Sequence, residues 1–205
     1  MLENINKSRE CMSEIKTLIE GYAKEKNNIE IASSSTVLIK DNNLKILVDP
    51  GCNKKLLLEA LSKEELKPQD IDLIFITHYH PDHILNIRLF PDKDILDGDI
   101  IYKEDKLISF SGTIPNTSIK VIPTPGHAHE HACLLVETEK GKFVVAGDLW
   151  WWSEKEKQKT DYKSLINHKD PYVKDEKALK ESRKKILEIA DYIIPGHGKM
   201  FKVKK

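Results

Sequence analysis

The sequence predicts one layered α/β domain, with helices lying outside two blocks of strands. The 205 residues suffice for one ordinary domain, and a content of 40% apolar and 32% charged residues is typical of a chain with a buried core. Short aliphatic runs alternate with helical patterns along the chain. Each block of strands ends in a loop that carries histidine, so polar side chains of metal-ligand type are expected at strand ends.

The first half of the chain predicts an N-terminal helix, a hairpin, a second helix and a buried strand. Apolar residues between Ile5 and Tyr22 recur at helical spacing, so this helix would form an extension before the domain over residues 27–205. Residues 41–43 are a turn signal between two apolar runs. The expected segments are the helical extension at 1–26, hairpin strands at 29–40 and 44–48, a helix at 56–61 and a strand at 71–76.

The second half predicts short strands and one long helix. Residues 90–116 are polar and rich in Pro, Asp and Gly, which leaves room for short strands only. Residues 173–190 have helical periodicity and precede a last apolar run. The expected strands are 99–102, 107–110, 118–122, 132–136, 142–146 and 191–194.

Composition argues against several classes of protein. Lys and Arg together number 33 and Asp and Glu 33, so the chain lacks the positive charge typical of nucleic-acid and membrane-surface proteins. It has no apolar run long enough to cross a bilayer, and residues 1–7 lack the order of a secretory signal, so we expect a cytoplasmic protein without a membrane partner. Cys11, Cys52 and Cys133 have unrelated spacings and predict neither a disulfide framework nor a CxxC zinc site.

Histidine is concentrated in short clusters. The chain has eight histidines, and all but His168 lie at 78–83, at 127–131 or at 197. Histidine is only an intermediate core residue, whereas it is the commonest metal ligand. The clusters therefore predict a metal site, and the isolated His168 is expected to face solvent.

The first cluster follows directly on the apolar run at 71–76. Side chains two residues apart in an extended segment point to the same side, so His78 and His80 are expected to converge. The next residue is proline, which keeps this segment extended, and Asp82 and His83 then begin a helix. These four side chains can therefore face two neighbouring points in space.

Three further strands are followed by side chains of ligand type. The motifs are Thr-Pro-Gly-His at 124–127, Gly-Asp at 147–148 and Pro-Gly-His-Gly at 195–198. Glycine lets the backbone approach closely at these points. Because open α/β sheets bind ligands at strand ends, the three motifs are expected to meet the first cluster at one edge.

In this order the motifs resemble the metallo-β-lactamase superfamily. They are His-x-His-x-Asp-His at 78–83 and the three motifs above, and Ile-Leu-Val-Asp-Pro-Gly at 46–51 resembles the strand and turn that precede the metal loop of that family. The resemblance implies a four-layer αββα sandwich with a dinuclear metal site at one edge. Residues 179–203 resemble the small branch of metallo-β-lactamase-domain-containing proteins, one of which is linked to histone pre-mRNA processing.

The resemblance also implies the metal ligands. By motif position they are His78, His80 and His127 for one ion, Asp82, His83 and His197 for the other, and Asp148 as the bridge. A histidine-rich site without thiolate suits two Zn²⁺ ions, although iron and manganese also accept imidazole and carboxylate. Asp82 is in addition the candidate catalytic residue, because its carboxylate can take a proton from the nucleophile and pass it to the leaving group.

Other residues are candidates for supporting the ligands or contacting substrate. Asp49 is expected to orient a ligand, and His131 to support one, whereas His129 has no counterpart in the family. Tyr79 either donates to a substrate oxyanion or packs. Of three consecutive tryptophans at least one, with Trp150 the candidate, is expected at a substrate wall or an oligomer contact, the alternative being packing under the next loop.

The first functional hypothesis is a dinuclear metal-dependent hydrolase acting on a small-molecule substrate. A metal-bound hydroxide would cleave an ester-type bond, that is a thioester, lactone, carboxylic ester or phosphoric ester. The alternatives are an iron-dependent oxidoreductase of persulfide-dioxygenase type and an RNA or DNA phosphodiesterase. Neutral charge and few arginines disfavour nucleic acid. The sequence names no substrate and leaves a homo-oligomer open.

Overall fold

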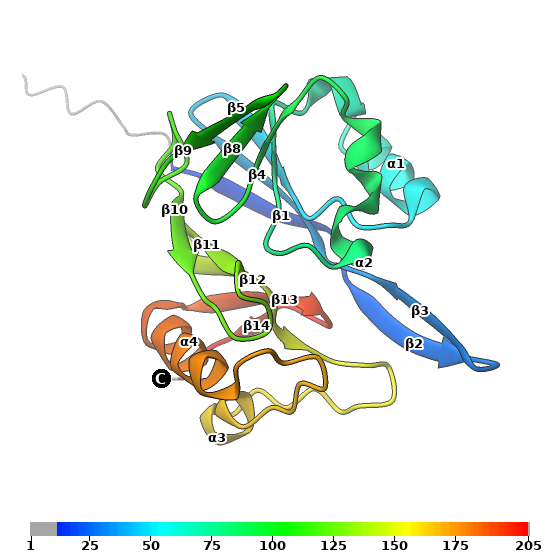
Figure 1. The fold of residues 1–205 in the computed structure, drawn as a ribbon, viewed down its shortest axis with the longest axis vertical. Coiled ribbons are helices and arrows are strands. Elements are labelled where there is room, and N and C mark those ends of the chain that lie inside the picture. The colour runs from blue at the N-terminus through cyan, green and yellow to red at the C-terminus, as the bar shows by residue number, and fades with distance from the viewer. Residues whose placement is uncertain (1–11, 205) are drawn as a thin grey trace, which may run out of the picture.

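Two twisted sheets face each other in the computed structural model, which describes residues 12–204 (Figure 1). Helix α1 covers the outer face of one sheet, α3 and α4 cover the outer face of the other, and the short α2 lies near the β2–β3 hairpin. This arrangement confirms the layered α/β fold and the αββα sandwich that the resemblance implies. No helix within residues 12–204 is long and apolar enough to cross a membrane.

The first sheet has seven strands and is mixed. Its order is β1-β4-β5-β6-β7-β8-β9, and only the pairs β5–β6 and β6–β7 are parallel. Because parallel neighbours end at the same edge, β5 and β6 deliver their following loops side by side. The strands are β1 (Glu14–Ile19), β4 (Thr36–Asp41), β5 (Leu44–Val48), β6 (Leu73–Phe75), β7 (Asp94–Leu96), β8 (Ile100–Lys103) and β9 (Lys106–Ser109).

The second sheet has five strands in the order β10-β11-β12-β13-β14, with β12 and β13 parallel. A separate hairpin of β2 (Tyr22–Lys26) and β3 (Ile29–Ser33) projects from the body of the molecule (Figure 1). The strands of the second sheet are β10 (Lys120–Pro123), β11 (Ala132–Thr138), β12 (Gly141–Trp151), β13 (Tyr192–His197) and β14 (Phe201–Lys202).

Side-chain caps define where three of the helices begin. Asn53, Asp161 and Asp175 each accept a hydrogen bond from a backbone N–H of the first turn, which satisfies one of its free donors. The α-helices are α1 (Lys54–Lys63), α2 (Pro81–Ile84), α3 (Tyr162–Ile166) and α4 (Glu176–Ile189). Short 3-10 helices lie at Pro68–Asp70 and Leu85–Leu89.

Strand alternation divides the apolar side chains among three cores. On β4, Val37 and Ile39 point between the sheets, whereas Leu38 points to the core under α1. The third core lies between the second sheet and α4, where Val144 packs with Ile186. Since each sheet buries both faces, the edge that carries the histidine loops is held by a rigid frame.

The predicted N-terminal helix is wrong over the described residues. Residues 14–19 and 22–26 are strands, and β1 pairs antiparallel with the edge of β4. The apolar residues that suggest helical spacing include Ile19, which is buried beside α1 from its position on β1. Pairing with β4 supplies this segment with backbone partners and burial that override a weak helical pattern. The part of the prediction at residues 1–11 lies outside the described residues.

The remaining predicted elements are found with small changes. The run at 29–40 is divided between β3 and β4, while the turn at 41–43 joins β4 and β5 as predicted. The strand expected at 142–146 continues through Asp148 to Trp151 as part of β12, after a register shift near Gly147. The helix expected at 173–190 is α4.

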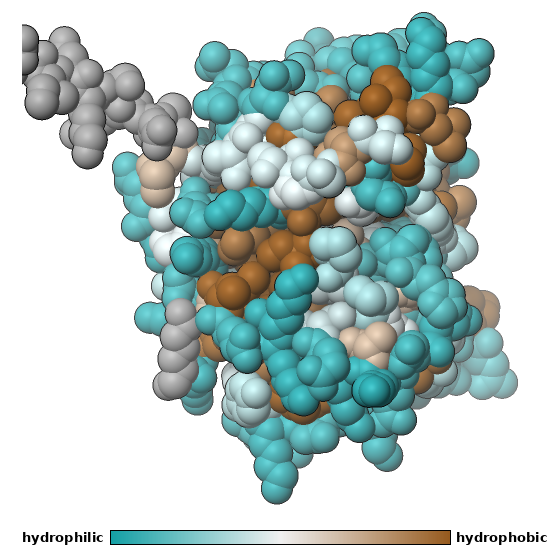
Figure 2. All heavy atoms as spheres, turned by 60° about the vertical axis from the view of Figure 1, so that its left-hand side comes forward, coloured by the Kyte–Doolittle hydropathy of each residue, from teal (hydrophilic) through white to brown (hydrophobic). Residues whose placement is uncertain are grey.

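Figure 2 shows apolar side chains in a band across the middle of one face of the molecule, within an otherwise hydrophilic surface. Separately, the edge strand β9 exposes Leu107 and Ile108, which are 69% and 44% accessible. Within residues 12–204, β9 pairs only with β8, so its outer edge keeps unpaired backbone groups.

Candidate metal centre

The loop after β6 places the first cluster at the edge of the first sheet. His78 and His80 follow the strand, and His80 has extended backbone, with φ −67° and ψ 140°. Pro81 then begins α2, whose first turn carries Asp82 and His83. The change from extended to helical backbone sends the two pairs of side chains in different directions.

The other three predicted ligands come from the second sheet. His127 lies in the loop between β10 and β11, Asp148 lies on β12, and His197 is the last residue of β13. The loop of His127 lies directly on α4, since a Cβ on Gly126 would be 2.3 Å from the Leu179 backbone. Close contact of this kind needs glycine.

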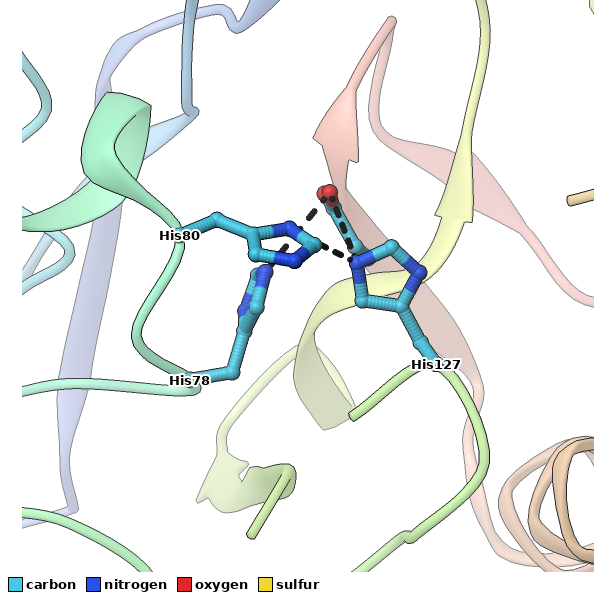
Figure 3. A group of neighbouring side chains, drawn as sticks. His78, His80 and His127 are labelled. Atoms are coloured by element: carbon cyan, nitrogen blue, oxygen red, sulfur yellow. Dashed lines mark hydrogen bonds and ion pairs between the residues drawn. The ribbon is translucent and has the colours of Figure 1, made fainter. Parts of the chain in front are cut away.

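The structure brings all seven predicted ligands together in two groups around Asp148. We call His78, His80 and His127 the three-histidine group, and Asp82, His83 and His197 the Asp82 group. Within the Asp82 group, and within the three-histidine group taken with Asp148, one ligand atom per residue lies within 4.8 Å of the others. Figure 3 shows the three imidazoles of the three-histidine group pointing toward one another.

Asp148 lies between the two groups. Its Oδ2 is 3.4 Å from His127 Nε2, and its Oδ1 is 3.3 Å from His83 Nε2. Burial alone would raise the pKa of this carboxyl, but the charges of His83 and His197 outweigh it and hold the pKa well below its usual value. Asp148 is therefore an ionised carboxylate with one oxygen directed to each group.

Several buried polar atoms in the centre have no hydrogen-bond partner among residues 12–204. They are His78 Nε2, His83 Nε2 and Asp148 Oδ1. A buried polar atom left unpaired costs about 1–3 kcal/mol, so a cluster of them indicates a partner that is not a hydrogen bond. Imidazole nitrogens and carboxylate oxygens converging at these distances fit two divalent cations.

The second nitrogen of several ligand histidines is bonded behind the centre. Such partners fix the tautomer and direct the other nitrogen, here Nε2, to the metal side. The Nδ1 contacts are His83 to Asp49 Oδ2 at 2.8 Å, His127 to Asp170 Oδ2 at 2.6 Å, His197 to the Tyr22 carbonyl at 3.0 Å and His78 to Thr77 Oγ1 at 3.1 Å.

Asp49 occupies the position expected of an orienting carboxylate. It also accepts hydrogen bonds from the Thr77 backbone N–H at 2.8 Å and from Thr77 Oγ1 at 2.7 Å. Asp49 has a φ of +47°, an uncommon conformation that aspartate tolerates better than most residues. The carboxylate therefore joins the ends of β5 and β6 to the ligand His83.

Asp170 is a site residue that the sequence does not predict. Its side chain is fully buried, and it contacts His127 from a loop 43 residues away in the sequence. Burial alone would raise the pKa of Asp170, but its hydrogen bond and charge interaction with His127 outweigh this, and the pKa is lowered. An aspartate in a charged loop without periodicity carries no signal from which this contact could be predicted.

The centre opens into a cleft of about 610 Å³. Ligand side chains at its floor include His80 and Asp82. One wall is the β2–β3 hairpin, and the other carries Trp151 and Tyr172, whose rings are 5.7 Å apart. The Trp151 ring lies 6.2 Å from that of His197, so an aromatic wall stands beside the metal centre.

Trp151, not Trp150, is the tryptophan at the cleft, so the assignment of Trp150 to the site is wrong. Trp150 is fully buried, and its Nε1 donates to the Leu165 carbonyl at 2.9 Å. Trp152 packs in the same core beside Phe201. Alternation along β12 explains the difference, because Trp150 and Trp152 share one face and Trp151 takes the other.

Two other candidates take positions behind or beside the centre. The Tyr79 hydroxyl contacts Asp97 and lies 3.0 Å from the Tyr102 hydroxyl. It is therefore hydrogen-bonded to protein side chains. His131 is buried, and its Nδ1 lies 2.8 Å from Thr124 Oγ1. Burial lowers the pKa of His131 to about 3, so the imidazole is neutral behind the ligand His78, whose ring is 5.3 Å away.

The remaining histidines lie outside both groups. His129 is exposed in the loop between β10 and β11. His168 is half-buried, contrary to the expectation that it faces solvent, because its Nε2 donates to the Trp151 carbonyl at 2.6 Å. The carbonyl of His168 accepts a hydrogen bond from the buried Arg183 at 2.5 Å. His168 therefore fastens the loop that carries Asp170.

Comparison with known proteins gives a match to a family model and to several curated relatives. The model of the metallo-beta-lactamase superfamily matches residues 30–108. Metallo-beta-lactamase domain-containing protein 1 of Xenopus laevis is 31% identical over 201 residues, which cover 93% of this chain and 82% of that protein. The matches to the mouse, rat and human proteins of the same name span 61%, 63% and 59% of their lengths.

Solved structures match the fold. A candidate metallo-β-lactamase from Thermotoga maritima has a TM-score of 0.70 and 21% identity, with 93% of this chain and 99% of that chain covered. AidC, a dizinc quorum-quenching lactonase, has a TM-score of 0.59 and 20% identity, with 82% and 73% covered. At this level of identity the likeness concerns the fold.

Proposed function

Because the chain belongs to the metallo-β-lactamase superfamily, we propose that it is a hydrolase that uses two divalent metal ions to cleave an ester-type bond. It falls in the branch of the metallo-β-lactamase domain-containing proteins. One observation carries the proposal: six side chains of ligand type converge around a seventh, Asp148, and buried atoms among them have no hydrogen-bond partner in the described part of the chain. Histidines that served only packing would not leave such atoms unpaired.

Each ligand side chain has a definite task in this reaction. Two bound divalent ions would lower the pKa of a water from ~15.7 towards ~7 and polarise the scissile oxygen. Asp148 directs one oxygen to each group, which fixes the position of the two groups relative to each other. Asp82 lies at the floor of the cleft with its side chain 25% exposed, so its carboxylate is placed to take a proton and pass it to the leaving group.

We further propose that the substrate is an uncharged carboxylic ester, thioester or lactone. Apolar side chains line the cleft on both walls, including Ile31, Leu85 and Trp151. The two lysines at the rim are paired with acids: Lys24 Nζ is 3.4 Å from Glu154 Oε1, and Lys155 Nζ is 2.9 Å from Glu25 Oε2. A phosphodiester chain binds through unpaired positive charge, which these two paired lysines do not offer.

A combined metal and substrate assay tests the proposal. Protein purified without added metal is analysed for its elements, stripped with a chelator, and reloaded with zinc, iron or manganese. We expect two ions per chain and hydrolysis of acyl esters, thioesters or lactones that is lost on stripping and restored on reloading. The same preparation is assayed with a phosphodiester, which we expect to be a poor substrate.

The alternatives predict different results in the same assay. Rapid turnover of the phosphodiester alone would favour a nucleic-acid phosphodiesterase. Two irons with oxygen uptake and no hydrolysis would favour the iron-dependent oxidoreductase. A chain that binds no divalent ion would contradict all three functions.

A further inference from the structure

One buried carboxylate connects a metal ligand to the wall of the cleft. Asp170 Oδ2 lies 2.6 Å from His127 Nδ1, and both side chains are fully buried. The other oxygen, Oδ1, accepts hydrogen bonds from Trp151 Nε1 at 3.3 Å and from the Tyr172 backbone N–H at 3.0 Å. The same residue therefore contacts the three-histidine group and the aromatic wall.

The contact with His127 fixes the tautomer and the orientation of this metal ligand. An ionised carboxylate can only accept, so His127 Nδ1 carries the proton and its Nε2 keeps a lone pair. That Nε2 faces the centre, 3.4 Å from Asp148 Oδ2. Asp170 thus determines both the tautomer and the orientation of the ring.

The contact with Trp151 fixes the orientation of this side chain in the wall of the cleft. Trp151 is half-buried, and its indole N–H has Asp170 as its partner. In the parallel ladder of β12 and β13, Trp151 lies opposite His197, so a rotation of the indole ring would change the space above that ligand. The hydrogen bond to Asp170 restricts this rotation.

We propose that Asp170 is a positioning residue that holds His127 toward its ion and Trp151 at the substrate cleft, which couples the metal affinity of the three-histidine group to the shape of the cleft. The proposal rests on the proposed function, since it requires that the two groups bind metal. It predicts that one substitution disturbs two features that lie on opposite sides of Asp170.

Asp49 provides a matched control. It is also a buried carboxylate behind a ligand, His83, at 2.8 Å. Its other side-chain partner is Thr77, which does not line the cleft. Loss of Asp49 is therefore expected to lower the metal affinity of the Asp82 group without changing the position of Trp151 in the cleft wall.

The test compares Asp170→Asn with Asp49→Asn. A carboxamide has one accepting oxygen, whereas the partners of Asp170 on both oxygens are donors, so the variant loses its hydrogen bond to His127 or to Trp151. If the two contacts are coupled as proposed, the loss of either one changes both the affinity for an ion and the exposure of Trp151. Ion affinities are measured by competition with a chromophoric chelator. The exposure of Trp151 is measured by acrylamide quenching, with Trp151→Phe identifying its share of the fluorescence.

We expect Asp170→Asn to lower the affinity for one of the two ions by roughly 10–100-fold and to increase the quenching of Trp151. Asp49→Asn is expected to lower the affinity for one ion by a similar factor and to leave the quenching unchanged. Wild-type affinities in Asp170→Asn, or wild-type quenching of Trp151, would overturn the proposal.

A second comparison covers the case in which Asp170→Asn does not fold. Trp151→Phe removes the indole donor but keeps the carboxylate on His127, and we expect a measurable decrease in the affinity for one ion. An unchanged affinity in Trp151→Phe would overturn the coupling.

These measurements need no substrate. A chain that binds two ions and shows the coupling, but hydrolyses nothing, would contradict the proposed function and leave the role of Asp170 intact. A chain that hydrolyses esters but shows no coupling would support the proposed function and contradict the role of Asp170.

Discussion

The two metal groups differ in what holds them in place. In the Asp82 group, His83 is bonded to Asp49, which follows β5 and also bonds to Thr77 after the neighbouring parallel strand β6. In the three-histidine group, His127 lies in a loop and is bonded to Asp170, which lies in another loop. His83 is therefore supported by residues at the ends of two paired strands, whereas His127 is supported by a contact between two loops.

This difference indicates which changes each group will tolerate. Ends of adjacent strands are fixed by backbone hydrogen bonds and by burial on both faces, so the Asp82 group should respond mainly to changes in the backbone around it. Loop segments open more readily than core strands. The three-histidine group should therefore respond to side chains that fasten the loops, including those of the cleft wall.

Loss of Asp148 is expected to have the largest effect, because this residue serves both groups. In Asp148→Ala, cations bound to the two groups lose the carboxylate that lies between them. We expect fewer than two ions per chain and a decrease in turnover of more than about 100-fold, beyond the range for losing a partner behind a ligand. Elemental analysis and an ester assay measure the two effects.

Circular dichroism tests whether Asp148→Ala is folded, as we expect because the substitution keeps the apolar side chains of the three cores. Two ions per chain with normal turnover would contradict the bridging role. Loss of one ion only would reveal which group depends on Asp148 more strongly.

Gly21→Ala should disturb the Asp82 group through the backbone. A Cβ on Gly21 would be 2.0 Å from the Gly196 carbonyl oxygen, directly before His197. We expect a loss of stability of about 1–3 kcal/mol and a lower affinity for one ion, because the Tyr22 carbonyl moves away from His197 Nδ1. Urea denaturation and chelator competition measure these quantities.

Gly98→Ala is the control for Gly21→Ala. A Cβ there would be 3.3 Å from Ala132 Cβ, away from the ligands, so both ions should bind as in the wild type. If Gly21→Ala lost stability and kept both affinities, the backbone around His197 would not determine the geometry of this group.

The sequence predicts the ligands better than the residues that hold them. Side chains such as His78 and Asp148 occur in short motifs next to apolar runs, and strand ends converge by a general rule of α/β sheets. Asp170 and Trp151 meet across 19 residues of chain, and their contact depends on how the loop before α4 folds back. No local periodicity encodes such a contact. For this reason the prediction from the sequence named Trp150 as the cleft residue, whereas Trp151 lines the cleft.

The error at the N-terminus has a related cause. Ile15 and Ile19 fit a helical face as well as they fit β1, and the choice is made by pairing with β4, about 20 residues away. In contrast, α4 could be predicted because its apolar positions repeat over several helical turns. Local patterns thus determine long elements, while non-local pairing determines short ones.

His131→Ala is expected to lower turnover moderately, because it disturbs the three-histidine group. His131 lies behind His78 and bonds to Thr124, so its loss leaves a buried space next to a ligand. We expect turnover to fall by ~10–100-fold with the fold retained. His129→Ala is the matched control in the same loop; its side chain is exposed, and ion affinities should be unchanged. A lower affinity in His129→Ala would show that the seven ligands are incomplete.

His168→Ala is expected to have the smallest effect on the metal centre and a measurable effect on stability. The variant loses the hydrogen bond to the Trp151 carbonyl, which is worth about 1 kcal/mol, and keeps two ions because Asp170 still holds His127. Burial lowers the pKa of His168, so below its unfolded pKa of about 6.5 the unfolded chain binds the additional proton and the wild type loses stability as the pH falls. The difference in unfolding free energy between wild type and variant should therefore narrow from about pH 7 to about pH 5.5. Urea denaturation of both proteins, each stripped of metal, measures this difference. A constant difference would mean that His168 is not buried as described, and loss of an ion would mean that the loop itself, rather than Asp170, supports the three-histidine group.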